Sequence, residues 1–280
     1  MQVLNLLTMR KYVLVFIILL CASCAEKNDD VLTFDISFDK QRDTETLHSS
    51  ELVSSVRHIR INNVDKWFNP SEKIKYVGGL YYLVNRKDAS IVIVDEEGNV
   101  LHCLNKRGRK NDEYVSLSDF DVNPANGDIC IYDESSAKVL VYSVKGSLIR
   151  SFRLDSSIEW YRGFSVLEDG GYLCYLPDYN RPDGGVKPRR GLWRADEKGV
   201  FQDYLLTFDE DFKLVQFRTT GYFCRLSDGT ICLIGEEDKD HVYHITPDGK
   251  TLSVAYRFRY DRKIPSSTLK LVVFGIAVFP

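Results

Sequence analysis

The stretch IVIVDEEGNVL, residues 91–101, joins an alternating apolar run to a second one through a charged turn that ends in glycine. The same pattern returns three times: VLVYSVKGSLI (139–149), LWRADEKGVFQ (192–202) and VYHITPDGKTL (242–252). Its glycines recur roughly every fifty residues, at Gly98, Gly146, Gly199 and Gly249. Apolar alternation predicts strands, and glycine supplies the positive φ that a tight hairpin requires.

A second glycine-containing hairpin precedes each of these: YVGGLYYLV, DVNPANGDICIY, VLEDGGYLCYL and RLSDGTICLI. Each repeat therefore holds four strands, which in the second repeat are expected at 119–123, 128–133, 138–143 and 147–153. A four-stranded antiparallel unit that recurs at this period is typical of a β-propeller blade. The predicted fold class is all-β, with four complete blades and a partial one, as a five-bladed ring or a shortened six-bladed ring.

The two ends of the chain bear on how the blades close. The segment SSVRHIRI, residues 54–61, is expected to be an N-terminal strand that completes the last blade. The C-terminal LKLVVFGIAVFP lacks polar alternation and turn residues. The predicted organisation is a signal segment (1–23), an acidic and polar tether (24–50) and a propeller domain (51–280).

The N-terminal segment predicts export. Its uncharged run, residues 12–25, is shorter than the roughly 20 residues that a membrane-spanning helix needs, and two cations precede it, as in a secretory signal. The residues before Cys24 resemble a bacterial lipobox, and acylation of Cys24 would anchor the protein in a membrane. The acidic stretch that follows resembles export tags of Bacteroidetes lipoproteins. We therefore expect an outer membrane lipoprotein at the cell surface, or otherwise on the periplasmic face; an unlipidated signal peptide is the alternative.

The composition of the chain limits the classes of partner and the disulfide chemistry that can be expected. The net charge of −3 comes without a basic block, which argues against nucleic-acid binding. Beyond the signal lie five cysteines at irregular spacing, which do not form a disulfide framework: Cys103, Cys130, Cys174, Cys224 and Cys232. Cys130, Cys174 and Cys232 each lie in a short apolar run and are expected to be buried free thiols. A hairpin at residues 227–229 would bring Cys224 and Cys232 face to face, and a disulfide between them is the alternative.

The sequence from VRHIRINN to LSDFDV, residues 56–122, resembles the six-bladed β-propeller lipoproteins of Bacteroides and relatives, which are similar to NHL-repeat propellers. The resemblance covers about residues 50–262. It includes the family's GxGPGEY loop, where Gly108, Glu113 and Tyr114 match here, whereas residues 110–112 replace the Gly-Pro-Gly core. Six-bladed relatives include calcium-dependent lactonases and lyases with carboxylate, Asn or His ligands around the central channel. The residues that such an enzyme would use here are Asp121, Asn123, Glu168, Asp169 and Asp228.

Long connections are expected at one end of the blades and short glycine turns at the other, and long loops on a rigid scaffold commonly bind ligands. These loops carry guanidiniums and aromatic rings that suit sugars, carboxylates or peptides: Arg107, Arg109, Tyr114, Trp160, Tyr161, Arg162, Tyr179, Arg181, Arg189 and Arg190. The alternative is that they are solvated charges and gap-filling rings.

The sequence contains no GxSxG, HExxH, P-loop or EF-hand pattern, so no cofactor or metal is expected. The predicted function is non-catalytic binding of an extracellular glycan, peptide or partner protein. The alternatives are a propeller enzyme of the lactonase or lyase type, or a truncated inactive fragment.

Overall fold

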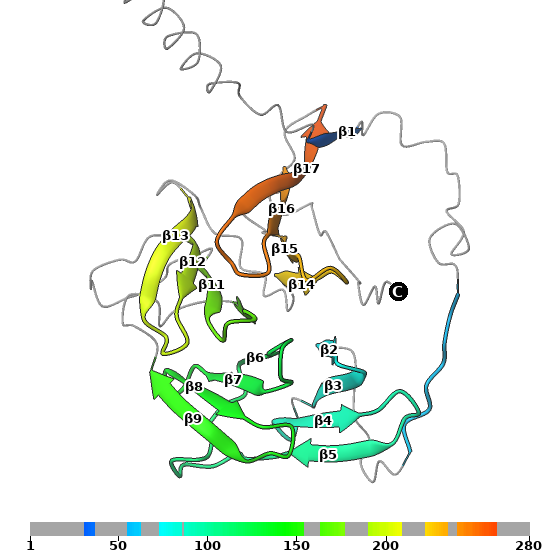
Figure 1. The fold of residues 1–280 in the computed structure, drawn as a ribbon, viewed down its shortest axis with the longest axis vertical. Helices are drawn as coiled ribbons and strands as arrows, with labels where there is room; N and C mark the ends of the chain where they lie inside the picture. The colour runs from blue at the N-terminus through cyan, green and yellow to red at the C-terminus, as the bar shows by residue number, and fades with distance from the viewer. Residues whose placement is uncertain are drawn as a thin grey trace, which may run out of the picture. The chain divides into compact units, whose positions relative to one another are not determined.

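The computed structural model describes residues 31–36, 55–62, 73–85, 87–153, 163–176, 190–208, 222–234 and 240–261. Within these residues the regular structure consists of β-strands, numbered β1 to β17 in chain order (Figure 1). No helix in this part of the chain is long and apolar enough to cross a membrane.

The strands form four antiparallel sheets, and each sheet is a meander of four strands that are consecutive in the chain. The first holds β2 (Ile74–Val77), β3 (Leu80–Asn85), β4 (Ser90–Val94) and β5 (Val100–Leu104). The second holds β6 (Asp119–Val122), β7 (Ile129–Asp133), β8 (Lys138–Tyr142) and β9 (Leu148–Arg153). The third holds β10 (Gly163–Val166), β11 (Tyr172–Leu176), β12 (Gly191–Ala195) and β13 (Phe201–Thr207). The fourth holds β14 (Phe223–Arg225), β15 (Ile231–Leu233), β16 (His241–Ile245) and β17 (Leu252–Tyr260), with β1 (Leu32–Ile36) added at its edge.

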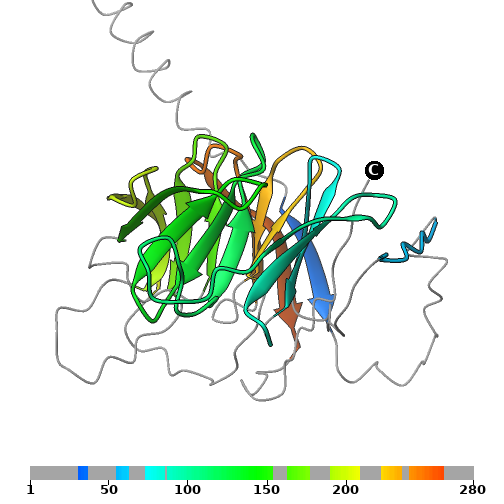
Figure 2. The ribbon, with the colours of Figure 1, turned by 90° about the horizontal axis from the view of Figure 1, so that it is seen from below.

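Within the described residues these sheets are four blades of a β-propeller, which confirms the predicted all-β propeller class and its four complete blades; the described strands include no further, partial blade. The first strand of each sheet is the innermost, and β6 contacts both β2 and β10, while β10 contacts β14 (Figure 1). Figure 2 shows the blades from the side. The four predicted strands of the second repeat match β6 to β9 to within one residue at every boundary.

The turn between the third and fourth strands is the same in all four blades. The N–H of its glycine donates to the carbonyl three residues earlier: Gly98 to Asp95, Gly146 to Ser143, Gly199 to Asp196 and Gly249 to Thr246. All four glycines have positive φ, between 67° and 87°. The turn is therefore one that a side chain would strain, and the predicted equivalence of the four glycines is confirmed.

Side chains alternate along each strand, so a blade that lies between two other blades has two buried faces. In β7, Ile129 and Ile131 belong to the apolar core shared with the first blade, whereas Cys130 and Tyr132 belong to the core shared with the third. Trp193 of β12 lies in that second core and is fully buried. Because successive side chains of a strand point to opposite faces, one strand contributes to two inter-blade cores.

The N-terminal strand of the last blade differs from the prediction. Residues 55–61 form no strand. Ile61 instead packs against the apolar cluster of the first sheet that contains Leu83 and Val92. The Arg57 guanidinium donates to the carbonyl of Glu96 (2.8 Å). The strand that extends the fourth sheet is β1, which lies within the segment assigned to the tether. The ring of Phe34 in β1 stacks on Phe258 of β17, with ring centroids 5.6 Å apart.

Candidate ligand-binding site

The connection between β5 and β6, residues 105–118, is the long loop that the structure describes in full, and we call it the interblade loop. Two backbone hydrogen bonds close it: Gly108 N–H donates to the Tyr114 carbonyl (2.9 Å), and Tyr114 N–H donates to the Lys106 carbonyl (3.0 Å). The carboxylate of Glu113 accepts the N–H of Lys110 (3.0 Å). The loop therefore holds its shape through its own hydrogen bonds.

Gly108 leaves room for the Glu113 side chain. A Cβ at Gly108 would lie 1.9 Å from Oε2 of Glu113, so the space of a side chain is already filled by that carboxylate. The loop keeps this arrangement although residues 110–112 depart from the Gly-Pro-Gly core of the resembling family. The closed shape therefore does not depend on that core.

Tyr114 anchors the loop to the blades. Its ring is fully buried in the core between the first and second blades. Its hydroxyl donates to the carbonyl of Ala89 and accepts the N–H of Lys106 (3.2 Å), and burial raises its pKa. A second buried hydroxyl, from Tyr142, donates to the carbonyl of Asp112 (3.0 Å). Tyr114 therefore supports the loop from inside the core, and its contact with a ligand stays a prediction.

The interblade loop presents two guanidiniums to solvent. Arg107 and Arg109 are both exposed. The two carboxylates of the loop already have lysine neighbours, Lys106 with Asp112 at 3.5 Å and Lys110 with Glu113 at 3.7 Å. Among the described residues, neither guanidinium has a carboxylate within ion-pair distance. Their planar sets of donors therefore remain available for a carboxylate, sulfate or phosphate group.

The structure describes only some of the residues of the predicted ligand-binding site. Arg190 lies directly before β12, is partly buried, and accepts the N–H of Phe208 at its carbonyl (3.0 Å). The remaining predicted residues lie outside the described residues: Cys24, Trp160, Tyr161, Arg162, Tyr179, Arg181 and Arg189.

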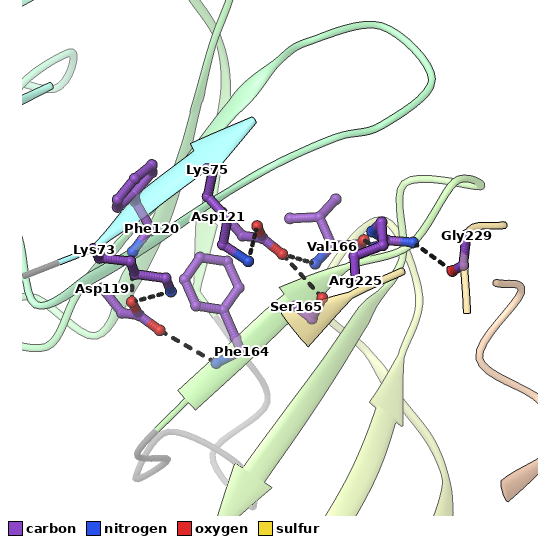
Figure 3. Close-up of polar contacts among 10 residues, drawn as sticks. All are labelled: Lys73, Lys75, Asp119, Phe120, Asp121, Phe164, Ser165, Val166, Arg225 and Gly229. Carbon is purple, nitrogen blue, oxygen red and sulfur yellow. Dashed lines mark hydrogen bonds and ion pairs between the residues drawn. The ribbon is translucent and has the colours of Figure 1, made fainter. Parts of the chain in front are cut away.

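A second group of polar side chains, the inner-strand charge cluster, lies on the innermost strands (Figure 3) and consists of Lys73, Lys75, Asp119, Asp121 and Arg225. Lys75 lies on β2, and Lys73 directly precedes that strand, where its carbonyl accepts the N–H of Val84 (3.3 Å). Asp119 and Asp121 lie on β6, so each pair of residues is two apart and shares one face. Nζ of Lys73 lies 2.6 Å from Oδ1 of Asp119, and Nζ of Lys75 lies 2.8 Å from Oδ1 of Asp121. These ion pairs connect the first blade to the second.

The same cluster continues to the third and fourth blades. Oδ2 of Asp121 accepts the hydroxyl of Ser165 and the N–H of Val166, both at 2.9 Å. The Arg225 guanidinium donates to the carbonyls of Val166 (2.5 Å) and Gly229 (3.2 Å). Figure 3 shows these contacts as one series across four inner strands.

The electrostatics of the cluster are those of an internal ion-pair network. Burial alone would raise the pKa of Asp121, but the charges of Lys75, Lys73 and Arg225 outweigh it and hold that pKa at about 2. Burial lowers the pKa of Lys73, and the neighbouring Asp119 opposes this shift. Asp121 therefore stays ionised and engaged within the protein, which makes it a poor general base.

Three of the other polar residues considered for a central enzyme site are engaged in turns or in an ion pair. The side chain of Asn123 accepts the N–H of Ala125 (2.8 Å), and Asp228 accepts the N–H of Thr230 (2.9 Å). Asp169 pairs with Arg194 (3.0 Å). Within the described residues, no group of three or more His, Cys, Asp or Glu side chains is placed to hold a metal ion.

The sequence analysis named Asp121 but missed the cations Lys73, Lys75 and Arg225. The available signal was the Lys-x-Lys spacing before the first glycine turn, set against Asp-x-Asp in the equivalent strand of the next repeat. The two spacings are complementary because equivalent inner strands of neighbouring blades, β2 and β6, lie in contact.

Comparison with known proteins assigns the chain to a family. A family model described as a domain of unknown function, DUF4934, matches residues 32–271. The chain belongs to the DUF4934 family. None of the curated proteins matches this DUF4934 chain.

Two solved structures resemble the DUF4934 chain. One is a protein of Bacteroides fragilis NCTC 9343 that is provisionally described as exported, with a TM-score of 0.63 and 14% identity over 82% of this chain and 60% of that chain. The other is a member of the DUF4221 family from Bacteroides vulgatus ATCC 8482, with a TM-score of 0.45 and 13% identity over 72% of this chain and 61% of that chain. The DUF4934 chain thus spans about three fifths of the Bacteroides fragilis protein. The first likeness shows a shared propeller fold.

Proposed function

We propose that this DUF4934 protein is a lipid-anchored, extracytoplasmic β-propeller that binds an extracellular ligand and does not catalyse a reaction. The binding surface is the end of the blades that carries the interblade loop. The ligand is a glycan, a peptide or a partner protein that offers acidic groups to Arg107 and Arg109. Anchoring is through acylated Cys24, at the cell surface of the outer membrane.

The observation that carries the proposal is the combination of a closed loop and exposed guanidiniums. Hydrogen bonds between Gly108, Tyr114 and Lys106 fix the backbone before any ligand arrives. A loop that is already ordered costs little conformational entropy on binding, so more of the contact energy appears as affinity. The guanidiniums of Arg107 and Arg109 project from this ordered backbone into solvent.

Two further observations support the other parts of the proposal, the extracytoplasmic location and the non-catalytic function. The Bacteroides fragilis protein that shares the fold is provisionally described as exported, in line with the signal-like N-terminus of this chain. A lactonase-type or lyase-type reaction would need free ligands on the inner strands, and the carboxylate of Asp121 is engaged by Lys75, Ser165 and Val166. The non-catalytic function is therefore the better supported one.

The test is a screen of the full chain on an array of neutral, uronate-bearing and sulfated glycans, together with acidic peptides. An Arg107→Ala/Arg109→Ala variant is compared with a Lys145→Ala/Lys198→Ala control, which removes the same charge from exposed glycine turns of β8–β9 and β12–β13. We expect an acidic probe to bind the wild type and the control equally. The loop variant should bind at least about tenfold weaker for each guanidinium removed, since a charged hydrogen bond contributes about 1.5–3 kcal/mol.

Equal affinity of all three proteins would contradict the assignment of the site. A probe that the wild type consumes, with release of a product, would contradict the non-catalytic function.

A further inference from the structure

The cysteines Cys224 and Cys232 are cross-strand neighbours on β14 and β15, the two innermost strands of the fourth blade. The register of β14 and β15 places them directly opposite one another. Backbone hydrogen bonds join the pairs two residues away on either side, Tyr222 with Ile234 (3.0 Å) and Leu226 with Thr230 (2.8 Å). By the alternation of an antiparallel ladder, the cysteines occupy a hydrogen-bonded position, where Cα atoms lie about 5.5 Å apart. A disulfide bridges Cα atoms about 4.4–6.8 Å apart.

The two thiols differ in environment. Cys232 is buried, whereas Cys224 is only partly buried. The thiol of Cys232 hydrogen-bonds to Cys224 and, together with the charge of Lys75, holds the pKa of Cys224 below its usual range despite burial. The same hydrogen bond raises the pKa of Cys232. Thiolate character and exposure make Cys224 the attacking sulfur, and Cys232 the thiol that resolves a mixed disulfide.

The other described cysteines have no such arrangement. Cys130 and Cys174 lie in the core between the second and third blades, where burial raises the pKa of each to about 12. Cys103 is exposed on β5, and the residue opposite it on β4 is Val92. Within the described residues, Cys224 and Cys232 are thus the one pair of cysteines that faces across a ladder.

We propose that Cys224 and Cys232 form a reversible redox site, which closes to an intramolecular disulfide on reaction with a disulfide oxidant. The Cys224 thiolate attacks one sulfur of the oxidant, forms a mixed disulfide and expels the other sulfur as a thiolate. Cys232 then loses its proton and attacks Sγ of Cys224, which expels the second thiolate of the oxidant. Two cysteine thiols are oxidised, the oxidant disulfide is reduced to two thiols, and the two cysteine protons balance those thiols.

The position of the pair gives the reaction a structural consequence. Opposite Cβ atoms lie about 4.5–5.5 Å apart, whereas a disulfide holds them about 3.8 Å apart. Bond formation therefore draws β14 toward β15. The residue after Cys224 is Arg225, whose guanidinium contacts the carbonyl of Val166 on β10. Oxidation of the two cysteines would therefore shift the backbone next to Arg225, whose contact with Val166 joins the third and fourth blades.

The test is differential alkylation of the native full chain after equilibration with oxidised glutathione. Free thiols are blocked with iodoacetamide, disulfides are then reduced and labelled with its heavy isotope form, and tryptic peptides are mapped; Arg225 provides the cleavage site that separates the two cysteines. We expect the heavy label on both Cys224 and Cys232, and a parallel digest without the reduction step should contain a cross-link between their peptides with the loss of two hydrogens. Titration with reduced glutathione should reverse it, and a Cys103→Ser control should retain it.

Three results would overturn the proposal: light label on both Cys224 and Cys232 after oxidation, a glutathione adduct on Cys224 that Cys232 never displaces, or a cross-link to another cysteine. The mapping is made on the wild-type protein, so it does not depend on the folding of a variant. Cys232→Ser provides a second check, because it should trap the glutathione adduct on Cys224; a Cys232→Ser protein with an unmodified Cys224 thiol would contradict the assigned attacking sulfur.

Discussion

Replacing Asp121 by asparagine keeps the shape of the side chain and removes the negative charge at the centre of the inner-strand charge cluster. Lys75, whose Nζ lies 2.8 Å from the carboxylate, then loses its counter-ion; the exposed fractions of the two side chains are 4% for Asp121 and 15% for Lys75. Removing one partner of a buried ion pair costs about 3–5 kcal/mol. We expect Asp121→Asn to lower the free energy of unfolding at pH 7 by about 3 kcal/mol, measured by urea denaturation of the full chain.

The same variant has a defined pH signature. The pKa of Asp121 falls from 3.8 to about 2 in the folded protein, which corresponds to about 2 kcal/mol of stabilisation. Because the folded pKa is the lower one, this contribution is fully present above the ordinary value and is lost as the pH falls toward about 2. The difference in stability between wild type and Asp121→Asn should therefore shrink by about 2 kcal/mol between about pH 5 and pH 2.

The matched control is Asp203→Asn, at an exposed position of β13. Its free energy of unfolding should stay within about 0.5 kcal/mol of wild type. The reasoning is refuted if Asp121→Asn is as stable as this control at pH 7, or if its deficit is the same at pH 6 and pH 2.5.

The other predictions concern the membrane anchor, a turn and the interblade loop. Cys24→Ala should move the protein from the membrane to the soluble fraction and abolish incorporation of radiolabelled palmitate; a wild type that never incorporates palmitate would contradict the anchor. Gly98→Ala should cost more stability than Gly78→Ala in chemical denaturation. Both have positive φ, but a Cβ at Gly98 meets a backbone carbonyl at 1.9 Å and one at Gly78 meets nothing within 4 Å; equal losses would contradict this. Tyr114→Phe should lower the free energy of unfolding by about 1–3 kcal/mol because the buried Ala89 carbonyl loses its donor, and an unchanged urea midpoint would contradict it.

The blades could be predicted because their signals are local. The alternation in β7 and β8 and the glycine at position 146 lie within about twenty residues of one another, and hairpin register follows from turn geometry. The strand at the edge of the fourth sheet could not be predicted in the same way. Both residues 32–36 and residues 54–61 contain alternating apolar residues. Which of them pairs with β17 depends on contacts between distant parts of the chain.

The surroundings of the candidate site residues could not be predicted from the sequence, and particular residues show why. Tyr114 and Arg107 lie in the same loop, but only the structure shows that the ring is buried while the guanidinium is exposed. Sequence spacing placed Asp121 on an inner strand. The ion pair of its carboxylate with Lys75 and its hydrogen bond with Ser165 depend on the neighbouring blades, which the spacing does not show. Residue type indicates what a side chain can do, and burial and partners decide what it does.

Amide hydrogen exchange of residues 105–118 in the ligand-free protein is the most direct test of the claim that the interblade loop is ordered before binding. The N–H groups of Gly108 and Tyr114 should exchange as slowly as those of the adjoining strands, because both donate to carbonyls within the loop. Exchange of these two amides at the rate of an unstructured peptide would contradict the account.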